Sequence, residues 1–237
     1  MAFPRFPTSG QVFAIGHRGV RSRTVENSLA GFRLAAVLAR EGRCDGVELD
    51  LRTTADGEFV VHHDPVLRSG EMISAVPLSV VRARPLEDGS TVPTLAEALE
   101  ALEGLEIFIE VKRLPRSSGG ALVAQLQARD DRACHVHAFD HRVIARLRHL
   151  DADLPLGVLS CSYPIDPVGQ VHDAGASTLW QEAHLIDEAL VVKCRRESVA
   201  LIAWTVNDAA EAARLRTLGV DGLCGDSPER LTRDERR

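Results

Sequence analysis

An alternation of short apolar segments with longer amphipathic segments runs through this 237-residue chain and limits the folds it can adopt. Short apolar runs bounded by turn residues predict strands, and apolar residues at helical spacing predict helices. Eight such strand–helix units in about 240 residues predict a TIM (β/α)8 barrel, an α/β fold with a closed parallel sheet. The predicted strands are Val12–Gly16, Asp45–Leu51, Ile107–Val111, Ala133–Ala138, Leu156–Leu159, Ser177–Trp180, Val199–Thr205 and Asp221–Cys224. The predicted helices are Leu29–Ala39, Thr94–Leu102, Gly120–Arg129, Arg142–Leu150, Val168–Asp173, Asp187–Arg195 and Ala209–Leu218.

The main alternative is a doubly wound open sheet, but the Gly-rich fingerprint that would follow its first strand is missing. No linker or low-complexity segment divides the sequence, so we expect one domain over residues 1–237. The segment Pro65–Val92 is the least periodic, and we expect it to form a short insertion after the second strand. After this segment, Thr94 and Glu97 have the spacing of a capping box. Asn27 or Ser28 is placed to cap the first helix.

The second predicted strand contains the segment Gly-Val-Glu-Leu-Asp-Leu at residues 46–51. Successive side chains of a strand point to opposite faces, so the apolar residues would share one face and Glu48 and Asp50 the other. Burying an unpaired carboxylate costs roughly several kcal/mol, and a divalent metal ion with oxygen ligands would offset that cost. The alternative is a half-buried strand whose acids face water.

Further polar residues lie at the ends of the predicted strands, where such barrels carry their catalytic residues. Glu110 and Lys112 end the third strand on a common face. Glu48, Asp50 and Glu110 make an all-oxygen ligand set suited to Mg²⁺, Ca²⁺ or Mn²⁺. For Glu110 alone, a salt bridge with Lys112 or an arginine is an equal alternative. Arg18 and Lys112 would place positive charge beside the metal, as the binding of a phosphate anion requires, and an equal alternative is that either pairs with the acids.

Two histidines, His17 after the first strand and His63 after a short extended piece at residues 59–61, are candidates for proton transfer. Imidazole has an unperturbed pKa near 6.5 and can hold or release a proton at neutral pH. His62 competes with His63, because adjacent residues of an extended segment point to opposite sides. Trp204 ends a strand and would either line the substrate pocket or pack in the core. Two other histidines at predicted strand ends are candidates for a further role, His137 and His184.

Composition excludes several classes of partner. A formal net charge of −6 gives no basic field for nucleic acid, so we expect no nucleic-acid partner. No apolar run approaches the roughly 18 residues of a membrane span, so we expect no stable membrane insertion.

The five cysteines are odd in number and widely spaced, which favours buried thiols over disulfides or a zinc site. The N-terminal sequence lacks the apolar core of a signal peptide, which predicts a cytoplasmic location.

Taken together, these motifs resemble those of the glycerophosphodiester phosphodiesterase family over most of the chain. Each motif alone is weak evidence, but seven occur in the family's order. They are His17-Arg18-Gly19 followed by Glu26-Asn27-Ser28, Gly46-Val47-Glu48-Leu49-Asp50-Leu51, His63-Asp64, Pro93-Thr94-Leu95, Ile109-Glu110-Val111-Lys112, Trp204-Thr205-Val206-Asn207 and Gly219-Val220-Asp221-Gly222. The chain departs from the family at His137-Ala138-Phe139, where Ser-Phe is common, and at Cys224-Gly225-Asp226, where Thr-Asp is usual.

The resemblance implies a TIM barrel that hydrolyses glycerophosphodiesters to glycerol 3-phosphate and an alcohol. It implies a divalent ion (Mg²⁺, Ca²⁺ or Mn²⁺) on the three acids, phosphate contacts from the two cations, and an alcohol pocket beside the tryptophan. By number these residues are Glu48, Asp50 and Glu110, then Arg18 and Lys112, then Trp204, with His17 and His63 as general acid and base in an order left open. The alternatives are a lysophospholipase D-like hydrolase, which the 4% aromatic content supports little, and a non-catalytic phosphoester-binding barrel.

Overall fold

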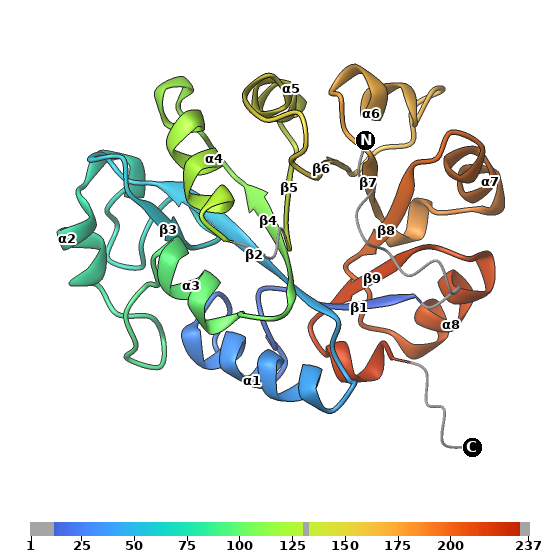
Figure 1. Cartoon of the computed structure of the whole chain (residues 1–237). Coiled ribbons are helices and arrows are strands. Elements are labelled where there is room, and N and C mark those ends of the chain that lie inside the picture. Colours follow the sequence, from blue (N-terminus) through green and yellow to red (C-terminus); the bar gives the residue numbers. More distant parts are fainter. Residues whose placement is uncertain (1–11, 130–132, 233–237) are drawn as a thin grey trace.

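The strands of the computed structural model, which describes residues 12–129 and 133–232, form one nine-stranded sheet (Figure 1). The strands are β1 (Phe13–Gly16), β2 (Gly46–Thr53), β3 (Phe59–Val61), β4 (Glu106–Val111), β5 (Cys134–Ala138), β6 (Leu156–Ser160), β7 (Thr178–Glu182), β8 (Ala200–Trp204) and β9 (Gly222–Gly225). All neighbours are parallel except β3, which runs antiparallel to the end of β2. Because β1 pairs with both β9 and β2, the parallel strands close on themselves, and the predicted TIM barrel is confirmed. The N-terminal residues used above to predict the cellular location lie outside the described ranges.

Helices alternate with the strands and form the outer layer of the barrel (Figure 1). They are α1 (Leu29–Arg40), α2 (Leu78–Arg82), α3 (Leu95–Ala101), α4 (Gly119–Gln127), α5 (His141–Leu150), α6 (Gly169–Asp173), α7 (Glu188–Arg196) and α8 (Ala209–Leu218). Each strand and helix predicted from the sequence lies close to its predicted ends. The sequence does not predict α2, because it has only five residues and lies in the irregular insertion, outside the alternation of strands and helices that predicts the equally short α6.

Side-chain caps fix where several of these helices begin. The hydroxyl of Ser28 accepts a hydrogen bond from the backbone N–H of Gly31 at 3.1 Å, so Ser28 is the cap of α1. Thr94 and Glu97 form the predicted capping box of α3. Asn27, the other candidate for the first cap, is bonded to Asp50 instead. This difference frees Asn27 to support the candidate site described below.

Apolar side chains pack on both sides of the barrel wall. Outward-facing strand residues such as Val47 and Leu49 are fully buried against the helices. Inside the barrel, Trp180 is the bulkiest buried side chain and packs among smaller apolar residues, namely Phe13, Ile15, Phe108, Leu159, Ile202 and Cys224. A filled barrel interior leaves its polar residues at the mouth formed by the C-terminal strand ends.

Between β3 and α3 the chain leaves the barrel, as predicted for Pro65–Val92. This insertion contains a short 3₁₀ turn at Ile73–Ala75 and the helix α2. Its apolar residues Leu67, Ile73, Val81 and Val92 form a separate cluster with Val60 of β3. In Figure 1 it lies beside β3, at the left. The insertion therefore lies next to the chain segment that carries His63.

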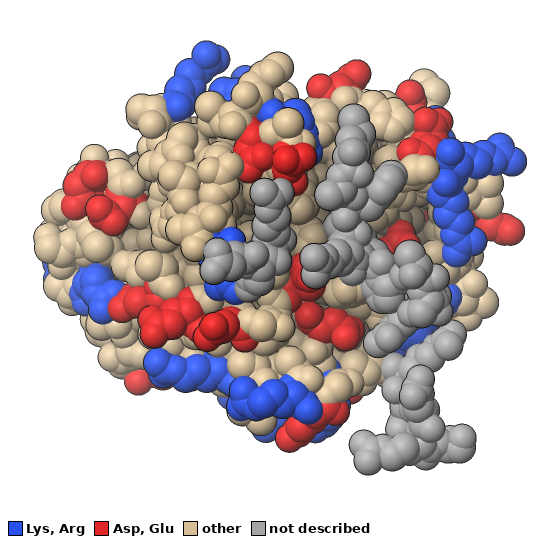
Figure 2. Space-filling view, viewed as in Figure 1, with Lys and Arg blue, Asp and Glu red and all other residues tan. Residues whose placement is uncertain are grey.

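The surface carries charged side chains of both signs, as the composition indicates. Figure 2 shows basic side chains interspersed with acidic ones over the visible face, unlike the continuous basic surface typical of nucleic-acid-binding proteins. Within the two described ranges, the helices are all too short or too polar to cross a bilayer.

Candidate active site

Three carboxylates from two adjacent strands lie at the mouth of the barrel. Glu48 and Asp50 come from β2 and Glu110 from β4, and their residues are 3%, 0% and 8% exposed. The register of the two strands pairs Asp50 with Glu110. The leucines and valine that alternate with these acids on β2 face the helices. The structure therefore brings together the three acids that the sequence predicts as a group.

Asp50 is held by two cations and an amide. Its carboxylate lies 3.1 Å from Arg18 Nε and 2.9 Å from Lys112 Nζ, and it accepts a hydrogen bond from Asn27 Nδ2 at 2.7 Å. Burial alone would raise the pKa of Asp50, but the charges of Lys112 and Arg18 outweigh burial and lower it. Asp50 is therefore ionised at neutral pH.

The negative charges of Glu48 and Glu110 are balanced less fully by nearby positive charge than that of Asp50. Glu110 Oε1 lies 2.5 Å from Lys112 Nζ, while Glu48 accepts a hydrogen bond from the backbone N–H of Arg18 at 3.0 Å. Burial, followed by the charges of Asp50 and Glu110, raises the pKa of Glu48 well above its ordinary value. Burial likewise raises the pKa of Glu110. Three buried carboxylates thus share two ion-pair partners within the described ranges, and this surplus of negative charge fits the binding of a cation.

Arg18 is itself shared with a further acid. Its guanidinium NH1 donates to both oxygens of Glu26 at 3.0 Å, so its charge is divided between Glu26 and Asp50. Its backbone has a φ of 53°, in the left-handed region that non-glycine residues seldom adopt. In this conformation its N–H points at Glu48. The turn after β1 therefore supplies both a side-chain cation and a backbone donor to the site.

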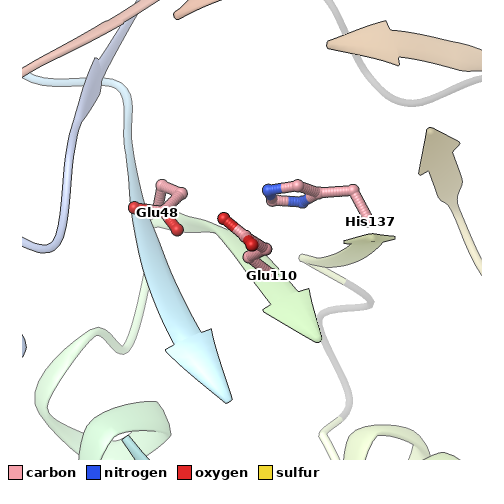
Figure 3. Close-up of side chains that lie close together, drawn as sticks. All are labelled: Glu48, Glu110 and His137. Atoms are coloured by element: carbon pink, nitrogen blue, oxygen red, sulfur yellow. The ribbon is translucent and has the colours of Figure 1, made fainter. Parts of the chain in front are cut away.

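A fourth side chain, that of His137 on β5, completes a compact group with two of the acids. Ligand atoms of Glu48, Glu110 and His137 all lie within 4.8 Å of one another, and Figure 3 shows the three side chains directed toward a common point. The register of β4 and β5 pairs Glu110 with His137. Burial, followed by the charge of Lys112, lowers the pKa of His137 well below its ordinary value, so the imidazole is neutral.

Sequence reasoning selects His137 only as one of two strand-end histidines and does not place it beside the acids. The signal that could have found it is the alternation on β5: Val136 packs against the helices, so His137 faces the barrel interior, in the strand next to that of Glu110. The other candidate, His184, lies in a turn after β7 with its side chain 67% exposed and is not part of this group.

His17 is fixed by an acid from the far end of the chain. Its Nδ1 lies 2.8 Å from Asp226 Oδ1, and the hydrogen bond from His17 is the first cause of a lowered pKa at Asp226. Asn207 also donates to Asp226, at 3.0 Å. An acid on Nδ1 fixes the orientation of the ring and turns its Nε2 away from that acid. Sequence reasoning does not predict Asp226 as a site residue and names it only within Cys224-Gly225-Asp226, where the chain departs from the family pattern.

His63 has a similar arrangement. Its Nδ1 lies 2.8 Å from Asp64 Oδ1. Burial lowers the pKa of His63, while the charge of Asp50 acts in the opposite direction, which indicates that His63 lies near the carboxylates. The neighbouring His62 bonds to the backbone carbonyl of Asp64 at 2.9 Å. His63 therefore stays the candidate for proton transfer.

Trp204 ends β8 at the rim of the mouth and is partly buried. Its ring packs edge-on against Phe139, with centroids 5.5 Å apart and an interplanar angle of 80°. The indole N–H has no hydrogen-bond partner among the described residues. Trp204 thus offers a flat apolar wall with one unused donor.

A cavity of about 1330 Å³ opens beside His63, between the turn after β1 and the insertion. It is lined by residues of both segments, including Glu26, Asn27, Asp64 and Arg84. The cavity does not include the three carboxylates but reaches their neighbours Asn27 and His63. A substrate group larger than a phosphate could extend from the acids into this space.

Comparison with known proteins gives a consistent result. A family model described as the glycerophosphoryl diester phosphodiesterase family matches residues 17–230. A glycerophosphodiester phosphodiesterase from Caldanaerobacter subterraneus subsp. tengcongensis is 26% identical over 241 residues, which cover 93% of this chain and 96% of that protein. The solved structure of an Oleispira antarctica phosphodiesterase in complex with the product sn-glycerol-3-phosphate is 23% identical, with a TM-score of 0.85 over 94% of this chain and 96% of that one. A glycerophosphodiester phosphodiesterase from Thermotoga maritima has a TM-score of 0.75 at 24% identity, over 92% of this chain and 96% of that one. At this identity the two solved structures show the shared fold.

Proposed function

We propose, because this chain belongs to the glycerophosphoryl diester phosphodiesterase family, that it hydrolyses glycerophosphodiesters to glycerol 3-phosphate and an alcohol with the help of a divalent metal ion. Membership of this family makes the protein a phosphoric diester hydrolase. The observation that carries the metal dependence is the buried group of three carboxylates. These three acids have only two cationic partners among the described residues, Arg18 and Lys112.

Glu48, Asp50 and Glu110 would hold the ion, because carboxylate oxygens suit Mg²⁺, Ca²⁺ and Mn²⁺. The raised pKa values of Glu48 and Glu110 support this role, since a bound cation would favour their ionised forms. When bound, such an ion supplies Lewis-acid polarisation of a phosphate oxygen.

Arg18 and Lys112 would bind the remaining charge of the phosphate. Both cations already lie within 3.1 Å of Asp50, so they are held at the same place as the proposed metal ligands. Two fixed cations stabilise the negative charge that develops on a phosphoryl group without reorganising as the reaction proceeds.

His17 and His63 would move the protons. Each has an aspartate on Nδ1, which fixes the ring and leaves Nε2 for substrate or water. One histidine would take a proton from the nucleophile, and the other would donate one to the leaving alcohol. Trp204 would form the apolar wall against which an alcohol or glycerol group packs.

The substrate class is tested with a panel of diesters. Purified protein is incubated with glycerophosphocholine, glycerophosphoethanolamine and glycerophosphoglycerol, and with lysophosphatidylcholine as an acyl-bearing comparison, in the presence of Mg²⁺, Mn²⁺ or Ca²⁺. We expect glycerol 3-phosphate from at least one of the three water-soluble diesters. Turnover of lysophosphatidylcholine alone would replace this substrate class by a lysolipid, and binding without turnover of any of them would indicate a phosphoester-binding barrel.

A further inference from the structure

His137 is buried without a hydrogen bond to any residue that the structure describes. The residue is 1% exposed, and its Nδ1 is a buried polar atom without a partner in the part of the chain that the structure describes. Leaving a buried polar atom unsatisfied costs about 1–3 kcal/mol, so such an atom in a native site calls for an explanation. A stacking contact does not supply one, because it uses the face of the ring and not its nitrogens.

His135, two residues earlier on the same inward face of β5, shows the contrast. Its Nε2 lies 2.6 Å from Glu106 Oε2, and its ring stacks on Phe108 with centroids 4.6 Å apart. His135 therefore has a structural role that its contacts account for. The ring of His137 stacks on Trp180 at 4.1 Å with an interplanar angle of 7°, which fixes its plane but leaves its nitrogens to the barrel mouth.

The position of His137 in the sheet shows which groups its nitrogens face. Asp50, Glu110 and His137 occupy one row of the sheet, because β2 pairs with β4 and β4 with β5 in that register. The two ends of this row differ: Asp50 is ionised and lies against Arg18 and Lys112, whereas His137 is neutral and faces the two glutamates (Figure 3). Two ligand atoms of one ion are at most about 4.4 Å apart when each bond is about 2.2 Å. The ligand atoms of Glu48, Glu110 and His137 lie within 4.8 Å of one another, so small rotations of the glutamate side chains would let all three bind one ion.

We propose that His137 is a protein ligand of the metal ion, and that its nitrogen makes the site prefer Mn²⁺, Co²⁺ and Zn²⁺ to Mg²⁺ and Ca²⁺. The proposal rests on the metal-binding part of the proposed function and adds the ligand that decides which ion is bound. Imidazole suits transition metals, whereas Mg²⁺ and Ca²⁺ favour sites made of oxygen alone. The two glutamates and one histidine leave further positions for Asp50, water or a phosphate oxygen.

The test measures metal binding on the full chain, made metal-free with EDTA and then desalted. Mn²⁺ binding is followed by electron paramagnetic resonance, and electron spin-echo modulation of the bound Mn²⁺ detects a directly coordinated ¹⁴N. We expect ¹⁴N modulation in the wild-type protein and its loss in His137→Gln. We also expect the affinity for Mn²⁺ to fall by at least about tenfold in His137→Gln, with a smaller change for Ca²⁺ measured by calorimetry.

His135→Gln is the matched control, because it removes an imidazole from the same face of the same strand and leaves the cluster intact. This variant should keep both the ¹⁴N modulation and the Mn²⁺ affinity. If His137→Gln does not fold, His137→Asn replaces it, and the wild-type spectrum tests the presence of nitrogen by itself.

The outcomes separate this proposal from the proposed function. Mn²⁺ that binds without ¹⁴N modulation, or modulation that persists in His137→Gln, would overturn the role of His137 and leave the metal site of oxygen ligands standing. Equal or higher affinity for Ca²⁺ than for Mn²⁺ would overturn the selectivity. A wild-type protein that binds none of these ions would overturn the metal dependence itself.

Discussion

Glu48 forms no ion pair within the described ranges, and burial together with two neighbouring carboxylates raises its pKa. A folded-state pKa above the unfolded value means that ionisation of this group destabilises the fold. The site therefore lowers the stability of the metal-free protein, which is a common property of residues placed for function and not for stability. Glu48 is thus the residue at which the proposed metal site should measurably lower the folding stability of the metal-free protein.

We expect Glu48→Gln to raise the melting temperature of the metal-free protein at pH 7. The amide keeps the shape and removes the charge, and a gain of about 1 kcal/mol corresponds to a shift of roughly 2–4 °C in a chain of this size. The gain should shrink as the pH falls toward about 4.3, the unfolded pKa of Glu, because both states are then protonated. Thermal melts in EDTA from pH 4 to pH 8 measure this effect, with the exposed Glu100→Gln as the control. A lower melting temperature for Glu48→Gln at pH 7 would contradict the assignment of a surplus negative charge.

His17→Ala should lower kcat by about 10²–10⁴-fold while leaving the fold and metal binding unchanged, since this is the usual contribution of a general acid or base. Asp226→Asn keeps the ring in place but weakens its orientation, so its loss of kcat should be smaller. Steady-state rates with one glycerophosphodiester, together with circular dichroism, measure both variants. Near-normal turnover by His17→Ala would remove His17 from the proton-transfer step.

At the scale of the elements, strand register decides which side chains meet. The period of two on β2 and β4 predicts from sequence that the acids share a face, because alternation is a local property of a strand. The row Asp50–Glu110–His137 is not readable in the same way, since it depends on how far each strand is shifted against its neighbour. The capping box of α3 is again a local feature, and the sequence predicts both of its residues, Thr94 and Glu97.

The capping box of α3 gives a prediction for stability. Thr94 accepts from the backbone N–H of Glu97 at 3.2 Å, and Glu97 accepts from that of Thr94 at 2.8 Å. Thr94→Ala should therefore lower the free energy of unfolding by about 0.5–2 kcal/mol, the usual cost of losing an N-cap. Urea unfolding measures the loss, and Thr217→Ala, at an exposed position inside α8, should cost less. Equal losses in the two variants would mean that the capping box contributes nothing specific.

At the scale of the whole molecule, closure of the barrel brings together residues that the sequence cannot relate. His17 and Asp226 are 209 positions apart and meet because β1 pairs with β9. The alternation of elements suffices to predict the barrel, and the strand-end rule suffices to predict most of the polar residues at its mouth. The sequence offers Arg18 and Lys112 as partners of the acids, and both pair with Asp50. It does not predict the pairing of Asp226 with His17 or the approach of His137 to the two glutamates. These depend on tertiary geometry and on the short insertion, whose five-residue helix carries no periodic signal.

The most direct test of the account removes and restores the metal in the wild-type protein. Release of glycerol 3-phosphate from the diester that the substrate panel identifies is followed first in EDTA and then after adding back Mg²⁺, Ca²⁺ or Mn²⁺ in excess. The account predicts that EDTA abolishes release, that at least one ion restores it, and that no ion restores it in Glu48→Gln. Undiminished release in EDTA, or a fully active Glu48→Gln, would contradict metal-dependent hydrolysis at the three carboxylates.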